Sequence, residues 1–169
     1  DTLPFLEELR RMTDRYGAVL LGEVNGENPI QRAMQYTGKK RLHMAYTFSL
    51  LKQKPDAAFF ANTVAQAHAL KSKHKDSTFC YTLSNHDVPR VLSRWNGTNN
   101  EEDTTRHVAL LFGLALPGAY CMYQGEELGL SEADVPYEKM VDPFGLAFYP
   151  KFKGRDGCRT PMPWQRHAT

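Results

Sequence analysis

Residues 78–87 read Thr-Phe-Cys-Tyr-Thr-Leu-Ser-Asn-His-Asp, a run of β-branched and aromatic residues that ends in a polar tetrapeptide. The apolar half predicts a buried β-strand, and Ser84-Asn85-His86-Asp87 predicts the loop that follows it. In α/β proteins such a loop often carries function, because the strand fixes the side chains and the loop gives them access to solvent. His86 and Asp87 are therefore candidate site residues.

A second apolar run, Ala18-Val19-Leu20-Leu21-Gly22, ends in Glu23. It also predicts a strand whose last residue carries a carboxylate. Two carboxylates at the tips of two strands indicate acid/base chemistry on a polar substrate.

Hydrophobic periodicity predicts an alternation of helices and strands along the chain. Helices are expected over residues 2–17, 30–36, 57–72 and 104–116, and strands over residues 18–22, 42–48, 78–83 and 119–123. The expected strands are apolar on both faces. This order favours an α/β fold with a parallel sheet covered by helices, either a barrel or an open sheet.

Beyond about Leu130 the periodic pattern stops and proline and glycine become frequent. We expect a long functional loop there rather than a second domain.

Composition excludes several classes of function. The chain has 169 residues, of which 41% are hydrophobic and 24% charged, as in ordinary globular domains. The formal net charge is +2 without a basic stripe between aromatics, so no nucleic-acid partner is expected. The mean hydropathy is −0.52 and no apolar run reaches the roughly 18 residues of a membrane span, so no membrane partner is expected.

The cysteines and histidines show no metal-ligand spacing, so neither a metal nor another cofactor is expected. Cys80, Cys121 and Cys158 are an odd number without a CxxC pair, which favours free thiols in a reducing compartment, the cytoplasm.

Four motifs together resemble one family. Gly22-Glu23-Val24, residues 84–87 and residues 123–129 (Tyr-Gln-Gly-Glu-Glu-Leu-Gly) are similar to the ends of strands five, seven and eight of the α-amylase superfamily, glycoside hydrolase family 13. Residues 154–164 (Gly-Arg-Asp-Gly-Cys-Arg-Thr-Pro-Met-Pro-Trp) resemble the loop after strand eight in its α-glucosidase and oligo-1,6-glucosidase branch.

The resemblance implies a (β/α)₈ TIM-barrel fragment that covers about strands five to eight. Residues 1–130 would be the second half of the catalytic barrel, and residues 131–169 a long loop at its active-site face. The missing N-terminal half would be the partner of this chain.

The resemblance also implies a retaining, exo-acting α-glucosidase whose substrate is a short α-glucoside. Glu23 would be the general acid/base and Asp87 the third carboxylate, which holds sugar hydroxyls. His86 would bind the sugar at the cleaved position. Arg155 would close around the terminal glucose together with an acid from the first half of the barrel.

The nucleophile of this family is an aspartate at the end of strand four, within a Gly-Phe-Arg-hydrophobic-Asp motif that this sequence lacks. The chain alone is therefore expected to be inactive. Although calcium occurs in the family, no residue here is assigned as its ligand.

Other interpretations stay open at this point. Taken singly, Glu23 is typical of a loop cap or salt bridge, His86 and Asp87 of a helix N-cap, and Arg155-Asp156 of a surface ion pair. The whole chain could also belong to a non-catalytic, transporter-associated relative that keeps the barrel. Hydrolysis, isomerisation and transglycosylation are not distinguished.

Overall fold

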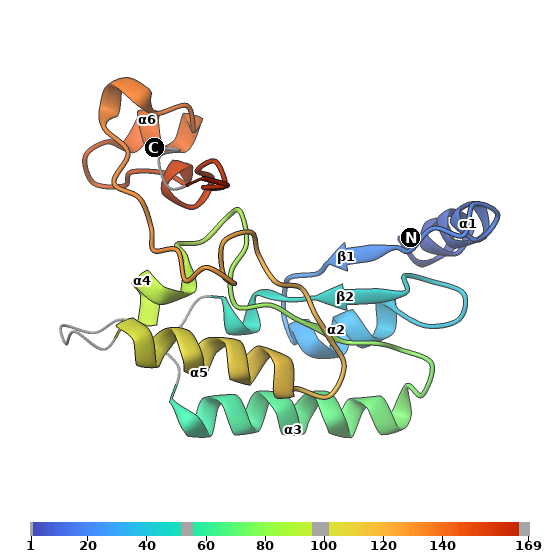
Figure 1. Ribbon diagram of the computed structural model, residues 1–169. Helices are drawn as coiled ribbons and strands as arrows, with labels where there is room; N and C mark the ends of the chain where they lie inside the picture. Colours follow the sequence, from blue (N-terminus) through green and yellow to red (C-terminus); the bar gives the residue numbers. More distant parts are fainter. Residues whose placement is uncertain (1, 52–55, 96–101, 166–169) are drawn as a thin grey trace. The chain divides into compact units, whose positions relative to one another are not determined.

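The computed structural model describes residues 2–51, 56–95 and 102–165 (Figure 1). The chain divides into two compact units. Unit 1 comprises Asp1–Thr82 and Gly113–Cys121, and unit 2 comprises Leu83–Phe112 and Met122–Thr169.

Unit 1 contains four short parallel strands: β1 (Leu21–Glu23), β2 (Met44–Tyr46), β3 (Cys80–Tyr81) and β4 (Ala119–Tyr120). β1 pairs with β2 and β3 pairs with β4, and a parallel bridge between Ala45 and Phe79 links the two pairs. The predicted parallel sheet is confirmed. Because parallel strands share a direction, the carboxyl end of β1, which is Glu23, lies at the same edge of the sheet as the carboxyl end of β3.

The predicted helices are also confirmed, with small shifts at their ends. They are α1 (Thr2–Asp14), α2 (Pro29–Tyr36), α3 (Ala57–Lys73) and α5 (Glu102–Ala115), and one turn of 3₁₀-helix, η1 (Phe48–Leu50), follows β2. Helix α2 packs against β2 and α3, as Figure 1 shows. The core of unit 1 consists of apolar side chains from these elements: Ile30, Ala33, Met34, Ala45, Leu50, Leu51, Ala67, Phe79 and Tyr81.

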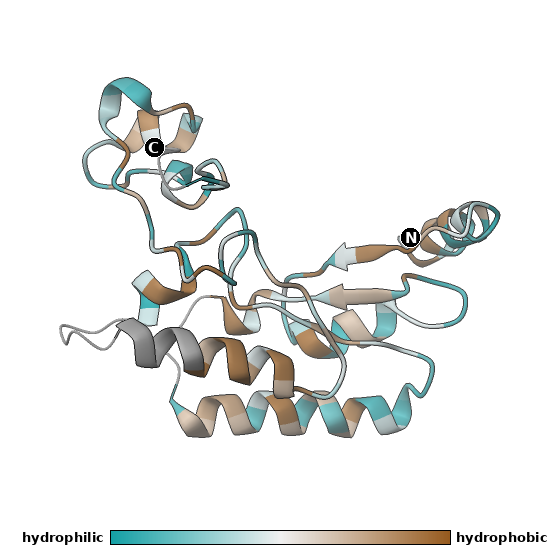
Figure 2. Ribbon diagram, viewed as in Figure 1, coloured by the Kyte–Doolittle hydropathy of each residue, from teal (hydrophilic) through white to brown (hydrophobic). Residues whose placement is uncertain are grey.

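Strand β1 is apolar in sequence but is not buried along its length. Leu21 is 44% exposed, and Val19 just before it is 64% exposed. Among the described residues β1 pairs with one strand, β2. The carboxyl half of α5 is apolar nearly all round and appears brown in Figure 2. Two of its exposed side chains are Leu111 and Leu114.

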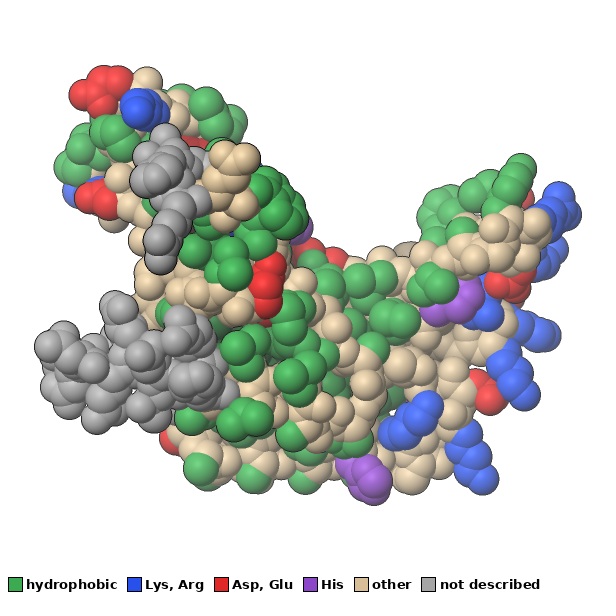
Figure 3. Space-filling model, viewed as in Figure 1, with side chains coloured by type: hydrophobic (Ala, Val, Ile, Leu, Met, Phe, Trp, Pro, Cys, Tyr) green, Lys and Arg blue, Asp and Glu red, His purple; other side chains and the backbone are tan. Residues whose placement is uncertain are grey.

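The lysine-rich segment at the end of α3 is a solvated helix terminus. Lys71 Nζ donates to the carbonyl of Lys75 at 2.9 Å and also to that of Ser77. Cations at this end of a helix interact favourably with its dipole. Figure 3 shows Lys and Arg side chains gathered at this end of unit 1.

Unit 2 contains more regular structure than the sequence predicted. It holds α4 (Val91–Trp95), the first part of α5, the 3₁₀ turn η2 (Tyr137–Lys139), α6 (Pro143–Phe148) and the 3₁₀ turn η3 (Asp156–Cys158). Apart from α5, which the sequence predicted, these elements are too short for a helical period to show in the sequence. Glu126 and Glu127 accept hydrogen bonds from the backbone N–H groups of Tyr123 (3.1 Å) and Gly125 (2.9 Å), so both side chains have a structural role in this turn.

Cys80, Cys121 and Cys158 are free thiols. Burial raises the pKa of Cys80 to about 12 and that of Cys158 to about 11, so both stay protonated at neutral pH and act as small apolar side chains. In the described ranges, none of the helices combines the length and the apolar character needed to cross a membrane.

The N-cap of α3 can be tested by mutation. Asp56 Oδ1 accepts the backbone N–H of Phe59 at 2.5 Å. Asp56→Ala should therefore lower the free energy of unfolding by about 0.5–2 kcal/mol in urea titrations. Asp76→Ala, which removes an exposed carboxylate just beyond the other end of α3, is the matched control and should cost less. Equal losses would contradict a capping role.

Candidate active site

The loop after β3 is held by two short side-chain hydrogen bonds. The buried Ser84 hydroxyl accepts the backbone N–H of Val91 at 2.9 Å, and Asn85 Oδ1 accepts that of Asp87 at 2.9 Å. Because Ser84 serves the first N–H of α4, the N-cap interpretation of His86 and Asp87 is wrong. These two side chains project instead from a fixed turn, His86 exposed and Asp87 partly buried.

Two arginines converge on one oxygen of Asp87. Arg155 Nη1 donates to Asp87 Oδ1 at 2.9 Å, and Arg159 Nη2 donates to the same oxygen at 3.1 Å. His86 Nε2 lies 3.6 Å from it. Arg159 also donates from Nε to the carbonyl of His86 at 2.8 Å. Within the described part of unit 2, no group donates to Oδ2.

Behind Arg155 lies a buried carboxylate, Asp142. Its Oδ2 accepts Nε of Arg155 at 2.9 Å and its Oδ1 accepts Nη2 at 2.8 Å, a bidentate pair. The backbone N–H of Arg155 also donates to Oδ2, at 2.8 Å. These bonds hold the pKa of Asp142 far below its usual range and raise the pKa of Arg155. The ring of Phe144 lies under the guanidinium, with 5.2 Å between the ring centroid and Cζ.

The segment that carries Asp142 is itself tied down by Asp156. Asp156 Oδ2 accepts the backbone N–H groups of Val141 at 2.8 Å and Asp142 at 2.9 Å. Arg155 therefore pairs with Asp142 and Asp87, whereas Asp156 binds backbone. The interpretation of Arg155-Asp156 as a surface ion pair is wrong, because both side chains turn inward to different partners.

A third arginine, Arg90, ties the loop after β3 to the rest of unit 2. Its side chain is buried, and it donates to the carbonyls of Gln124 at 2.6 Å and Cys158 at 3.2 Å. Its backbone N–H donates to Glu132 Oε2 at 2.8 Å. The Nη1 and Nη2 groups of the buried guanidinium are thus hydrogen-bonded, whereas its Nε has no partner among the described residues. The bonds that Arg90 makes hold these three segments together. The carboxyl of Glu132 is partly buried, and burial raises its pKa.

Glu23 lies in unit 1, at the end of β1. Its cross-strand neighbour is Tyr46 on β2, whose hydroxyl donates to Glu23 Oε2. Because paired residues on adjacent strands point to the same face, the tyrosine orients the carboxylate. Thus the structure brings His86, Asp87 and Arg155 together within unit 2 and gives Glu23 a separate partner in unit 1.

Three residues of this arrangement were missed from the sequence: Tyr46, Asp142 and Arg159. Arg159 could have been found, since it lies one helical turn after Arg155 in the same motif. Asp142-Pro143 carries the signature of a helix N-cap, so its sequence context indicates α6 rather than a site. Tyr46 is inconspicuous among the apolar residues of its strand.

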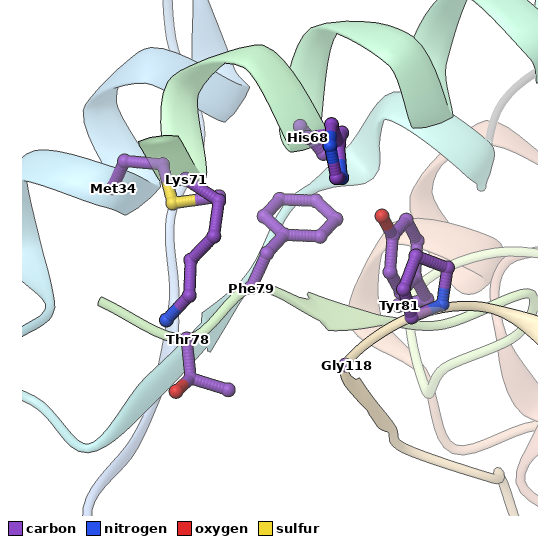
Figure 4. A pocket seen from close by; sticks show the side chains of 9 residues that line it. Met34, His68, Lys71, Thr78, Phe79, Tyr81 and Gly118 are labelled. Carbon is purple, nitrogen blue, oxygen red and sulfur yellow. The ribbon is translucent and has the colours of Figure 1, made fainter. Parts of the chain in front are cut away.

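The described part of unit 1 also contains a cavity of about 270 Å³, shown in Figure 4. Met34, His68, Lys71, Phe79 and Tyr81 line it, together with Ala67, Thr78, Pro117 and Gly118. It lies between α3 and the amino-terminal starts of β3 and β4. Glu23 ends its strand at the opposite, carboxyl edge, so this cavity is not the predicted site.

Comparison with known proteins assigns the family. The family model described as "Alpha amylase, catalytic domain" matches residues 1–169, and the chain belongs to this family. A "Probable alpha-glucosidase" of Rhizobium meliloti (strain 1021) is 40% identical over 98% of this chain and 30% of the relative. An "Oligo-1,6-glucosidase" of Heyndrickxia coagulans is 28% identical over 95% of this chain and 35% of the relative.

Solved structures agree with this assignment. The crystal structure of the α-glucosyl transfer enzyme XgtA is similar with a TM-score of 0.84 and 48% identity, over 96% of this chain and 30% of that protein. An isomaltulose-bound double mutant of MutB shares the fold with a TM-score of 0.73. The structural relatives are (β/α)₈ barrels, so this chain corresponds to part of such a barrel. It spans about a third of the length of the relatives it matches.

Gly154 makes the close approach of the two segments possible, which predicts the effect of a methyl group there. Its φ is +75°, and an added Cβ would lie 2.7 Å from Gly145 Cα and 2.8 Å from Asp142 Oδ2. Gly154→Ala should therefore destabilise the protein by at least about 1 kcal/mol in thermal unfolding. Gly17→Ala, also at positive φ but with no atom within 4 Å of the added Cβ, separates the backbone strain from the clash. A loss no larger than that of the control would contradict the packing argument.

The low pKa of Asp142 predicts a loss of stability in acid. Its ordinary pKa is 3.8 and the folded value lies below it, so the unfolded chain binds the proton first as the pH falls. The stabilising contribution is complete above the ordinary pKa and is lost as the pH falls through the folded pKa. The difference in free energy of unfolding between the protein and Asp142→Asn should thus shrink between about pH 6 and pH 2. A difference that is constant with pH would contradict this linkage.

Proposed function

We propose that this chain forms strands five to eight of the catalytic barrel of a retaining, exo-acting α-glucosidase that acts on short α-glucosides. Residues 1–130 would be the barrel half, and residues 131–169 the loop after strand eight at the active-site face. Membership of the α-amylase catalytic-domain family supports this, as do the four parallel strands with Glu23 at a carboxyl end.

The observation that carries the proposal is the arrangement around Asp87. Cationic side chains fix one of its oxygens, with Arg155 at 2.9 Å, and the other oxygen has no donor in the described part of unit 2. A carboxylate held in this way can accept two sugar hydroxyls and stabilise the positive charge of an oxocarbenium-like transition state. The adjacent His86 is exposed and can donate to the same sugar.

Glu23 is assigned as the general acid/base. A retaining enzyme needs one carboxylic acid that protonates the leaving oxygen and one carboxylate that attacks the anomeric carbon, about 5–5.5 Å apart. Tyr46, which donates to Glu23, keeps the side chain in one orientation. The attacking carboxylate would come from a part of the protein outside this chain, so the chain alone would be inactive. In the proposed reaction we assign no role to a metal or cofactor.

Glucosyl transfer is a second candidate reaction. The solved structure that is 48% identical to this chain is described as an α-glucosyl transfer enzyme. Transfer and hydrolysis share the glycosyl–enzyme intermediate and differ in whether an acceptor sugar or water takes the glucosyl group. The free thiols of this chain support a reducing compartment, the cytoplasm, as its location in either case.

Replacement of Glu23 tests the proposed function. In the full-length protein that carries this chain, Glu23→Gln should lower kcat on maltose by at least about 100-fold, because the amide cannot protonate the leaving oxygen. Glu8→Gln, on the exposed surface of α1, is the matched control and should leave kcat unchanged. Turnover of Glu23→Gln near that of the unmodified protein would refute the assignment.

Product ratios distinguish the two reactions. With p-nitrophenyl α-glucoside, hydrolysis should release p-nitrophenol and glucose in equal amounts. Transfer to an added acceptor sugar should release p-nitrophenol in excess of glucose, and the excess should rise with the acceptor concentration. Equal amounts at every acceptor concentration would eliminate transfer.

A further inference from the structure

Among the carboxylates of unit 2 whose side chains the structure describes, Asp142 is the most deeply buried one that the proposed reaction leaves without a role. Its side chain is 0% exposed, whereas the side chain of its partner Arg155 is 26% exposed. An ionised carboxylate in such a place is costly unless it is paired and hydrogen-bonded. The hydrogen bonds that compensate the charge of Asp142 therefore indicate which group it positions.

Those contacts determine the plane of the guanidinium. Asp142 takes the Nε and Nη2 edge of Arg155, at 2.9 and 2.8 Å, so the planar group cannot rotate without breaking both bonds. Phe144 covers one face of the same group. Once this edge is fixed, Nη1 is the remaining nitrogen of the fork, and it points at Asp87 Oδ1 at a distance of 2.9 Å.

The orientation of Asp87 depends on this bond. Its Oδ1 receives Arg155 and Arg159, and its Oδ2 is the oxygen without a donor in the described part of unit 2. A guanidinium that swung away from Asp87 would leave the carboxylate free to turn and would present either oxygen to a sugar.

We propose that Asp142 is a positioning residue that acts through Arg155, so that Arg155 Nη1 holds Asp87 Oδ1 and Asp87 Oδ2 faces the substrate. This inference rests on the proposed function, in which Asp87 contacts the sugar. Asp142 itself touches neither the substrate nor the reacting atoms. Its influence should therefore appear as a change in kcat/KM that depends on the presence of Arg155.

The test is a double-mutant cycle in the full-length protein, with kcat/KM measured on p-nitrophenyl α-glucoside. Asp142→Asn, which keeps the shape of the side chain, should lower kcat/KM by about 100-fold, the usual effect of a misplaced group. In the Arg155→Lys background, where the bidentate fork is absent, the same substitution should change kcat/KM by no more than about twofold. A purely structural role would lower kcat/KM by the same factor in both backgrounds and would overturn the proposal.

The matched control is Asp134→Asn, on the same segment. Asp134 pairs with Lys153 at 2.5 Å, and its side chain is 78% exposed. This variant should keep the kcat/KM of the unmodified protein. All rates are taken below the unfolding transition of each variant, so that loss of folded protein does not enter the comparison.

If Asp142→Asn does not fold, a measurement on the unmodified protein tests the proposal instead. Nuclear magnetic resonance of arginine side chains should show slow solvent exchange of the Arg155 Nε proton, because Asp142 holds it in a buried bond. Exchange as fast as that of the exposed Arg15 would overturn the proposal. This readout needs no substrate, so it tests Asp142 even if Glu23→Gln keeps its turnover and the proposed function fails.

Discussion

The bidentate pair between Asp142 and Arg155 is the interaction on which the described arrangement of unit 2 depends. A fully buried carboxylate must be compensated, and it draws in the guanidinium and the backbone N–H of Arg155. Asp156 adds the backbone N–H groups of Val141 and Asp142. These hydrogen bonds hold residues 140–142 beside residues 154–156. This closure leaves Arg155 with one outward nitrogen, and that nitrogen meets Asp87.

Unit 1 also fixes the orientation of a carboxylate, that of Glu23, but by a different interaction. There the parallel pairing of β1 with β2 sets Glu23 beside Tyr46, and a cross-strand hydrogen bond orients the carboxylate. One acidic group is thus placed by sheet register and the other by buried ion pairs. Sheet register depends on backbone hydrogen bonds, which pH hardly affects, whereas the ion pairs depend on an ionised Asp142.

The secondary structure of unit 1 could be predicted because its signals are local. Asp56 precedes an apolar periodic run and caps α3, and Pro29 begins α2. The strand positions were right, whereas the exposure of β1 depends on the elements packed against it and not on its own residues. The short elements of unit 2 escaped prediction for another reason. α4 and α6 have five and six residues, fewer than two helical turns, so they leave no period to detect.

For the candidate site, the sequence alone determined which residues stand at the ends of strands and in the loop after β4: Glu23, His86, Asp87 and Arg155. It also determined the family, because four motifs occur in a fixed order. Only the tertiary structure decided the partners of these residues, namely Asp142 and Arg159 in unit 2 and Tyr46 in unit 1. The physical reason is that the hydrogen-bond partners of a side chain depend on which groups folding brings close to it, and these can be distant in the sequence. Arg155 pairs with a carboxylate thirteen residues away, Asp142, because its neighbour in sequence, Asp156, accepts the backbone N–H groups of Val141 and Asp142 instead.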